Sequence, residues 1–191
     1  MINDQETINI FIIRHGEAAK LWDEDPDPSL SKKGQLQSNG IVQKLINELD
    51  RKEFNVLSSP LKRARETAAP LQKKLGFEIK IDDTFAEIPS PEITLSDRKN
   101  WLKSIFDTNV ADLGEVQKNW RDGIINSISR LEEHTVIFSH FMVINCVVGW
   151  LEKKTQMVSF YPDNCSVTKI EIGNNTIKLV TKGEELKTIV Q

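Results

Sequence analysis

Short apolar runs alternate with longer amphipathic stretches along this chain. The runs at 8–13, 54–58 and 135–139 consist mainly of residues that favour β-strands, and a weaker run lies at 77–81. Each run is followed, directly or after a loop, by a stretch with helical spacing of its apolar residues. This alternation predicts an α/β fold.

The amphipathic stretches predict helices at about 32–49, 59–75, 98–106, 116–131 and 141–151. Ser31 is a candidate N-cap of the first helix, and Ser59 followed by Pro60 predicts the start of the second. The apolar positions of the first helix are Leu36, Ile41, Leu45 and Leu49. In the fourth helix they are Val116, Trp120, Ile124, Ile128 and Leu131, at spacings of four and three.

Two β-prone segments close the chain, at 166–172 and 176–181, around the turn Gly173-Asn174-Asn175. We therefore expect a three-layer sandwich, with a mixed, mostly parallel sheet flanked by helices and a C-terminal β-hairpin. The sequence contains no internal repeat and no linker. Residues 1–191 are expected to form a single domain.

Polar side chains suited to phosphate follow the predicted strands. Arg14 and His15 end the first strand, Arg63 lies just after the second, and His140 follows the fourth. The carboxyl ends of parallel strands meet at one sheet edge, where ligands bind in open α/β sheets. Arginine presents a planar fork to phosphate, and histidine can act as a nucleophile. Arg65 is two residues from Arg63 on a helix and cannot share its face.

Five motifs, in this order, resemble those of the histidine phosphatase superfamily, also called phosphoglycerate-mutase-like. The resemblance covers nearly the whole chain and is greatest for the compact bacterial branch, which includes protein phosphohistidine phosphatases. The motifs are Arg14-His15-Gly16-Glu17; Leu30-Ser31-Lys32-Lys33-Gly34 with Gln37; Ser58-Ser59-Pro60-Leu61-Lys62-Arg63-Ala64 with Thr67-Ala68; Ala86-Glu87-Ile88; and Val136-Ile137-Phe138-Ser139-His140.

The resemblance implies a role for each matching residue. His15 would be the nucleophile that carries a transient phosphoryl group, and Arg14, Arg63 and His140 would bind the phosphoryl oxygens. His140 would also stabilise charge in the transition state. Glu87 would protonate the leaving oxygen and then activate water, although Glu92 is a nearby rival.

The sequence departs from the family pattern around these residues. Ala18 and Leu21 stand where many members carry polar phosphate contacts, and Phe141-Met142 replaces a frequent glycine pair. These changes affect the leaving-group side more than the phosphate pocket. Trp22, Trp101 and Phe106 are candidates for an aromatic subsite there, with ordinary packing as the alternative.

Composition and charge indicate which classes of binding partner the protein is expected to lack. Of the 191 residues 39% are hydrophobic and 28% charged, and a net charge of −3 gives no electrostatic footprint for nucleic acid. No apolar run has membrane length, and the N-terminus lacks the features of a signal peptide. Cys146 and Cys165 lie among apolar residues, as in a reduced cytoplasmic protein. We expect a cytoplasmic location; the sequence does not fix the oligomeric state.

The resemblance, together with these features, implies a metal-independent phosphatase acting on a phosphorylated small molecule or protein. No cofactor or metal is expected, because the sequence has no paired-histidine motif and two arginines beside His15 would repel a divalent cation. The alternatives are a non-catalytic phospholigand-binding module and a phosphoglycerate-type mutase. The short stretch between Glu87 and His140 leaves little room for the lid segments that a mutase needs.

Overall fold

A central sheet of six strands organises the computed structural model, which describes residues 7–49, 53–76, 78–174 and 176–186. The strand order is β3-β2-β4-β1-β5-β6. β1, β4, β2 and β3 are parallel, whereas β5 pairs antiparallel with both β1 and β6. This confirms the predicted mixed sheet and its C-terminal hairpin. The strands are β1 (Ile8–Arg14), β2 (Asn55–Ser58), β3 (Ile79–Ile81), β4 (Thr135–Ser139), β5 (Val167–Gly173) and β6 (Thr176–Thr181).

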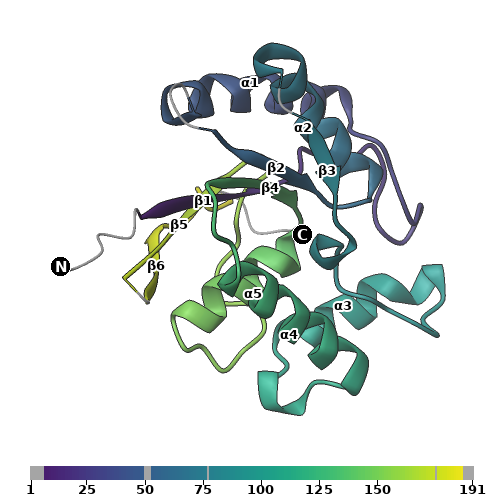
Figure 1. The fold of residues 1–191 in the computed structure, drawn as a ribbon. Helices are drawn as coiled ribbons and strands as arrows, with labels where there is room; N and C mark the ends of the chain where they lie inside the picture. Colours follow the sequence, from purple (N-terminus) through teal and green to yellow (C-terminus); the bar gives the residue numbers. More distant parts are fainter. Residues whose placement is uncertain (1–6, 50–52, 77, 175, 187–191) are drawn as a thin grey trace.

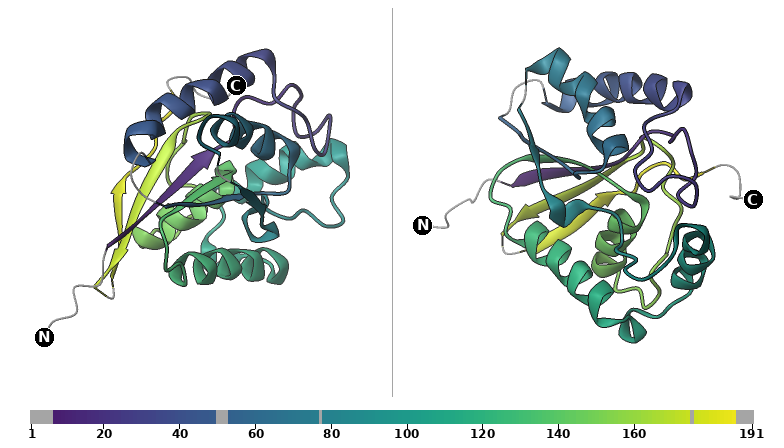
Figure 2. Two further views of the ribbon diagram at one scale, coloured as in Figure 1. Left: turned by 45° about the horizontal axis from the view of Figure 1, so that its top comes forward. Right: turned by 90° about the vertical axis from the view of Figure 1, so that its right-hand side faces the viewer.

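Helices cover both faces of the sheet, as predicted (Figure 1). α1 (Lys32–Leu49) and α2 (Lys62–Leu75) lie on one face, and α4 (Glu115–Ser129) and α5 (Phe141–Leu151) lie on the other. α3 (Arg98–Phe106) is on the same side as α4 and α5, beyond the sheet (Figures 1 and 2).

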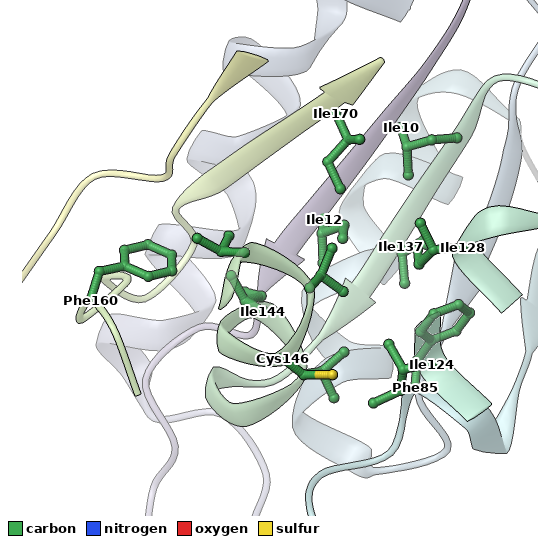
Figure 3. Packing of buried hydrophobic residues seen from close by; sticks show 13 residues of the cluster. Ile10, Ile12, Phe85, Ile124, Ile128, Ile137, Ile144, Cys146, Phe160 and Ile170 are labelled. Carbon is green, nitrogen blue, oxygen red and sulfur yellow. The ribbon is translucent and has the colours of Figure 1, made fainter. Parts of the chain in front are cut away.

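The middle of strand β1, from Ile10 to Ile13, is apolar and buried, because helices cover both faces of the sheet. Phe11 and Ile13 pack with the buried side chains of α1 and α2, whereas Ile10 and Ile12 pack with those of α4 and α5. Figure 3 shows the second cluster, in which Ile124 and Ile128 of α4 and Ile144 of α5 surround the strand residues. The core therefore fixes β1 from both sides and holds its carboxyl end in place.

Three predictions about the helices are wrong: the start of α2, the burial of Leu36 and the burial of Val116. α2 begins at Lys62 with Leu61 as its N-cap, not at Ser59-Pro60. The Ser59 hydroxyl accepts from the Leu61 amide at 3.2 Å, which forms a turn before the helix, and it also bonds to His140. Leu36 is 74% exposed. At about 100° per residue it points some 140° away from Ile41, and so leaves the buried stripe.

The start of α1 is as predicted, since Ser31 Oγ accepts a hydrogen bond from the Gly34 amide at 3.0 Å. Val116, in contrast, is 47% exposed, because it lies in the first turn of α4 and burial begins further along that helix.

Both cysteines are buried free thiols. Burial raises the pKa of Cys146 and of Cys165 to about 12, so neither is a ready nucleophile. Among the described residues, no helix combines the length and apolar character needed to cross a bilayer.

Candidate active site

The carboxyl ends of β1 and β4 lie side by side and bring the predicted phosphate residues together. Arg14 pairs with Ser139 in the sheet register, and the His15 amide donates to the Ser139 carbonyl at 2.9 Å. His140 follows Ser139 directly, and its ring centroid lies 5.1 Å from that of His15. Three strand ends thus meet at one point, since the adjoining β2 leads through Ser59 to Arg63.

His15 is buried and held in one orientation. Its Nδ1 lies 2.7 Å from the Gly16 carbonyl, and Arg63 Nε donates to its Nε2 at 3.1 Å. This network assigns the proton to Nδ1 and leaves the lone pair on Nε2. Burial, together with the charges of Arg63 and Arg14, lowers the pKa of His15 well below 6.5. The ring is therefore neutral and has a nitrogen able to attack an electrophile.

Three buried donors beside His15 lack hydrogen-bond partners among the described residues. They are Arg14 Nε, Arg63 Nη1 and His140 Nδ1. Buried polar groups in proteins are nearly always paired, so these atoms indicate a place for an anionic ligand. Burial lowers the pKa of both arginines, although guanidinium groups stay charged in proteins.

His140 is fully buried, with Nε2 2.7 Å from the Ser59 hydroxyl oxygen. Burial and the charge of Arg63 lower the pKa of His140 well below 6.5. A neutral His140 whose Nε2 accepts from Ser59 carries its proton on Nδ1, the atom that has no partner among the described residues. That tautomer makes His140 a donor to an anion.

Glu87 lies in the loop between β3 and α3 and lines the same cavity as His15, Arg14 and Arg63. Its Oε1 accepts from the amides of Ile88 at 3.1 Å and Met142 at 3.2 Å. Burial raises the pKa of Glu87, although the charges of the two arginines oppose the shift. The loop itself is anchored by Trp120, whose Nε1 donates to the Ala86 carbonyl at 3.0 Å.

The rival acid Glu92 is exposed, has a φ of 65° and does not line this cavity. Arg65 is likewise exposed, whereas Arg63 is buried; their spacing predicted different faces, and the motif indicated that Arg63 is the inward one. Glu17 braces the cavity rim, because it accepts from Ser31 and pairs with Lys33 at 2.7 Å. The hydrogen bond from Lys33 is the main reason that the pKa of Glu17 is lowered.

The sequence reasoning missed two contacts to the His15 segment. Asn164 Nδ2 donates to the His15 carbonyl at 3.0 Å, and Thr67 Oγ1 accepts from the Gly16 amide at 2.9 Å. Thr67 lies within a recognised motif and Asn164 lies just before the predicted strand at 166–172, but neither position indicates a contact with the His15 segment. Both hold the backbone around the nucleophile.

The cavity has a volume of about 360 Å³. Trp22 and Phe106 line it, as anticipated for an aromatic subsite. Trp101 does not line it; its ring packs behind Trp22, with centroids 6.3 Å apart. Over the described parts of the chain, no group of three or more His, Cys, Asp and Glu residues has an arrangement that could hold a metal ion.

Comparison with known families gives a clear match. The profile of the histidine phosphatase superfamily (branch 1) matches residues 10–185, a range that contains every residue discussed above as part of the site. The chain belongs to the histidine phosphatase superfamily. Comparison with curated protein sequences found no match.

Solved structures of histidine phosphatase relatives share the fold at low sequence identity. A phosphoserine phosphatase from Entamoeba histolytica superposes with a TM-score of 0.70 at 18% identity, covering 94% of this chain and 98% of that one. A mycobacterial glucosyl-3-phosphoglycerate phosphatase gives 0.64 at 18%, covering 85% and 92%. A phosphoglycerate mutase from Bacillus anthracis gives 0.65 at 16%, covering 94% of each chain.

Proposed function

We propose that this protein is a metal-independent phosphatase that hydrolyses a phosphomonoester through a phosphohistidine on His15. The observation that carries the proposal is the neutral His15 ring, whose Nε2 accepts a hydrogen bond from Arg63. Buried donor atoms of Arg14, Arg63 and His140 that lack partners among the described residues lie beside this ring. These groups supply the positive charge and hydrogen bonds that a phosphoryl group requires, so the reaction needs no metal ion.

In the first step the Arg63 Nε–H moves from His15 Nε2 to a phosphoryl oxygen, and the freed Nε2 lone pair attacks phosphorus as the bond from phosphorus to the ester oxygen breaks. The hydrogen bond that Nδ1–H donates to the Gly16 carbonyl supports the developing positive charge on the ring. Arg14, Arg63 and His140 bind the three phosphoryl oxygens. Glu87, whose pKa is raised by burial, acts in its protonated form and gives its proton to the departing alcohol oxygen.

In the second step water attacks the phosphohistidine. The Glu87 carboxylate takes one proton from the water molecule. The water oxygen bonds to phosphorus, and the bond from phosphorus to His15 Nε2 breaks. Inorganic phosphate leaves, His15 recovers its Nε2 lone pair and Glu87 its proton. One carboxyl group thus serves as acid and then as base, which requires a pKa between those of a free carboxyl and an alcohol.

A binding module without catalysis is the alternative from another class. Phosphate binding alone needs Arg14 and Arg63 but no aligned Nε2 lone pair and no anchored carboxyl group with a raised pKa. A mutase would have to keep water from the phosphohistidine. The fate of the phosphoryl group in an assay therefore decides between hydrolysis and phosphoryl retention.

Hydrolysis of 4-nitrophenyl phosphate in the presence of a metal chelator tests the proposal, with His15→Ala as the comparison. The expected result is phosphate release that survives the chelator and is lost in the variant. Undiminished release by His15→Ala would refute the mechanism. Failure of the wild-type protein to hydrolyse any of a panel of phosphomonoesters, while still binding phosphate, would favour the binding module. Interconversion of phosphoglycerate isomers faster than phosphate release would favour the mutase.

A further inference from the structure

Aromatic side chains form one wall of the cavity. The rings of Phe106 and Phe141 are stacked, with centroids 5.4 Å apart, and Tyr161 packs against both at 6.3 and 5.7 Å. Trp22 and Leu102 continue the apolar lining. Phe106 and Leu102 come from α3, Phe141 from α5 and Tyr161 from the segment before β5, so the wall is built by elements distant in sequence.

This aromatic wall adjoins the position of the leaving group. The Arg14 guanidinium carbon lies 5.3 Å from the centroid of the Phe141 ring, so the same ring borders the phosphate site. Glu87 is anchored by the amide of Met142, the residue after Phe141. An ester oxygen that receives the Glu87 proton therefore sits close to Phe141, and its carbon chain enters the aromatic part of the cavity.

Charges around the cavity disfavour an acidic leaving group. Arg63 is buried against His15, and Arg14 adjoins the same phosphoryl position. The two lysines that line the cavity, Lys20 and Lys99, are exposed, and Lys20 pairs with Asp25 at 3.7 Å. Asp23 also lines the cavity, and its carboxylate would repel a second anion, whereas the Glu17 carboxylate in the lining is paired with Lys33. The described lining thus offers no buried cation beyond the phosphate site.

We infer that the substrate is the phosphomonoester of a small, apolar, ring-bearing alcohol, and not a phosphorylated carboxylic acid. The inference rests on the proposed function, since it assigns the leaving group of that reaction. A cavity of about 360 Å³ is near the lower end of the range for small-molecule sites, which run from roughly 300 to 1,000 Å³. It accommodates a phosphoryl group together with a ring.

Three esters of alcohols with comparable leaving ability provide the test: 2-phenylethyl phosphate, ethyl phosphate and 3-phosphoglycerate. We expect kcat/KM for the phenylethyl ester to exceed that for ethyl phosphate by at least about tenfold, because the ring leaves water for the aromatic wall. 3-Phosphoglycerate is expected to be the poorest substrate. Equal values for the first two esters, or a preference for 3-phosphoglycerate, would overturn the inference.

A matched pair of leucine variants tests whether the preference for the phenylethyl ester arises at the cavity wall. Leu21→Asp places a charge in the cavity lining at a side chain that is 57% exposed, and is expected to reduce the preference for the phenylethyl ester severalfold. Leu36→Asp places the same charge on the exposed face of α1, outside the cavity, and is expected to retain the preference. Phe106→Ala is expected to act like Leu21→Asp. A preference unchanged in both Leu21→Asp and Phe106→Ala would exclude this wall.

The proposed function and the inference fail in different ways. If no ester is hydrolysed, the proposed function fails, and calorimetric titration of the wild-type protein with the phenylethyl and ethyl esters decides the inference. Binding of the phenylethyl ester that is at least about tenfold tighter supports an aromatic subsite. Equal affinities would refute it.

Discussion

Glu87→Gln is the substitution that most sharply separates a proton donor from a structural carboxyl group. The glutamine keeps an Oε1 that can accept from the amides of Ile88 and Met142, at 3.1 and 3.2 Å in the native protein. It replaces the second oxygen by an amide nitrogen that cannot protonate an alkoxide. The loop is therefore expected to stay in place while the acid is lost.

The size of the effect depends on the leaving group. Loss of a general acid slows a reaction by roughly 10²- to 10⁴-fold, or about 3 to 5 kcal/mol of barrier. We expect kcat/KM for the phenylethyl ester to fall by such a factor, because its alkoxide must be protonated. For 4-nitrophenyl phosphate, whose phenolate leaves without a proton, the expected fall in kcat/KM is less than about tenfold.

The second step gives an independent readout. Glu87→Gln also lacks the base that activates water, so with 4-nitrophenyl phosphate the phosphohistidine is expected to accumulate. Stopped-flow absorbance should show a burst of up to one nitrophenolate per chain, followed by slow turnover. Glu92→Gln, at the exposed rival acid, is the control and should match the wild type. An equal loss of kcat/KM for both esters, without a burst, would refute the assignment of Glu87.

Three further predictions concern the site and its support. The His15 ring is expected to titrate well below pH 6.5 in NMR spectra of the free protein, since burial and two arginines lower its pKa by disfavouring the charged form; it is therefore neutral at pH 7, and a midpoint at or above 6.5 contradicts this. Arg63→Lys removes the fork that contacts His15 and should lower kcat/KM by roughly 10²- to 10³-fold and weaken inhibition by inorganic phosphate, whereas Arg65→Lys at an exposed side chain should not. Gly34→Ala would place Cβ 2.1 Å from the Glu17 carbonyl oxygen and should reduce the free energy of unfolding by about 1 to 3 kcal/mol in urea denaturation; Gly40→Ala, with nothing within 4 Å in the same helix, should not destabilise, and equal effects would refute the steric argument.

Most of the phosphate site was predictable because its residues follow strands. An apolar run that ends in Arg14-His15 and another that ends before His140 must place these side chains at one edge if the strands are parallel. The choice of Arg63 over Arg65 followed from helical geometry together with the family motif, and the structure buries the first and exposes the second. The pattern of strands and helices thus located these side chains, although their catalytic roles remain proposals.

Features that depend on packing between distant segments were not predictable. Ser59 has the sequence context of a helix N-cap, but its hydroxyl accepts from the Leu61 amide in a turn before α2 and also bonds to His140 across the sheet edge. Tyr161 and Asn164 reach the site through the loop before β5, which has no sequence pattern of its own. Trp101 carries the same aromatic signal as Trp22, and only the fold decides which of them lines the cavity.

The central claim is that a phosphoryl group is carried by His15, and rapid-quench trapping tests it directly. The wild-type protein is mixed with a hydrolysable phosphomonoester, quenched in alkaline denaturant within one turnover, and digested for mass spectrometry. We predict up to one phosphoryl group per chain, on the His15 ring, which disappears when the ester is exhausted and is absent from His15→Ala. Turnover without any covalent phosphate, or with phosphate on another residue, would contradict this claim.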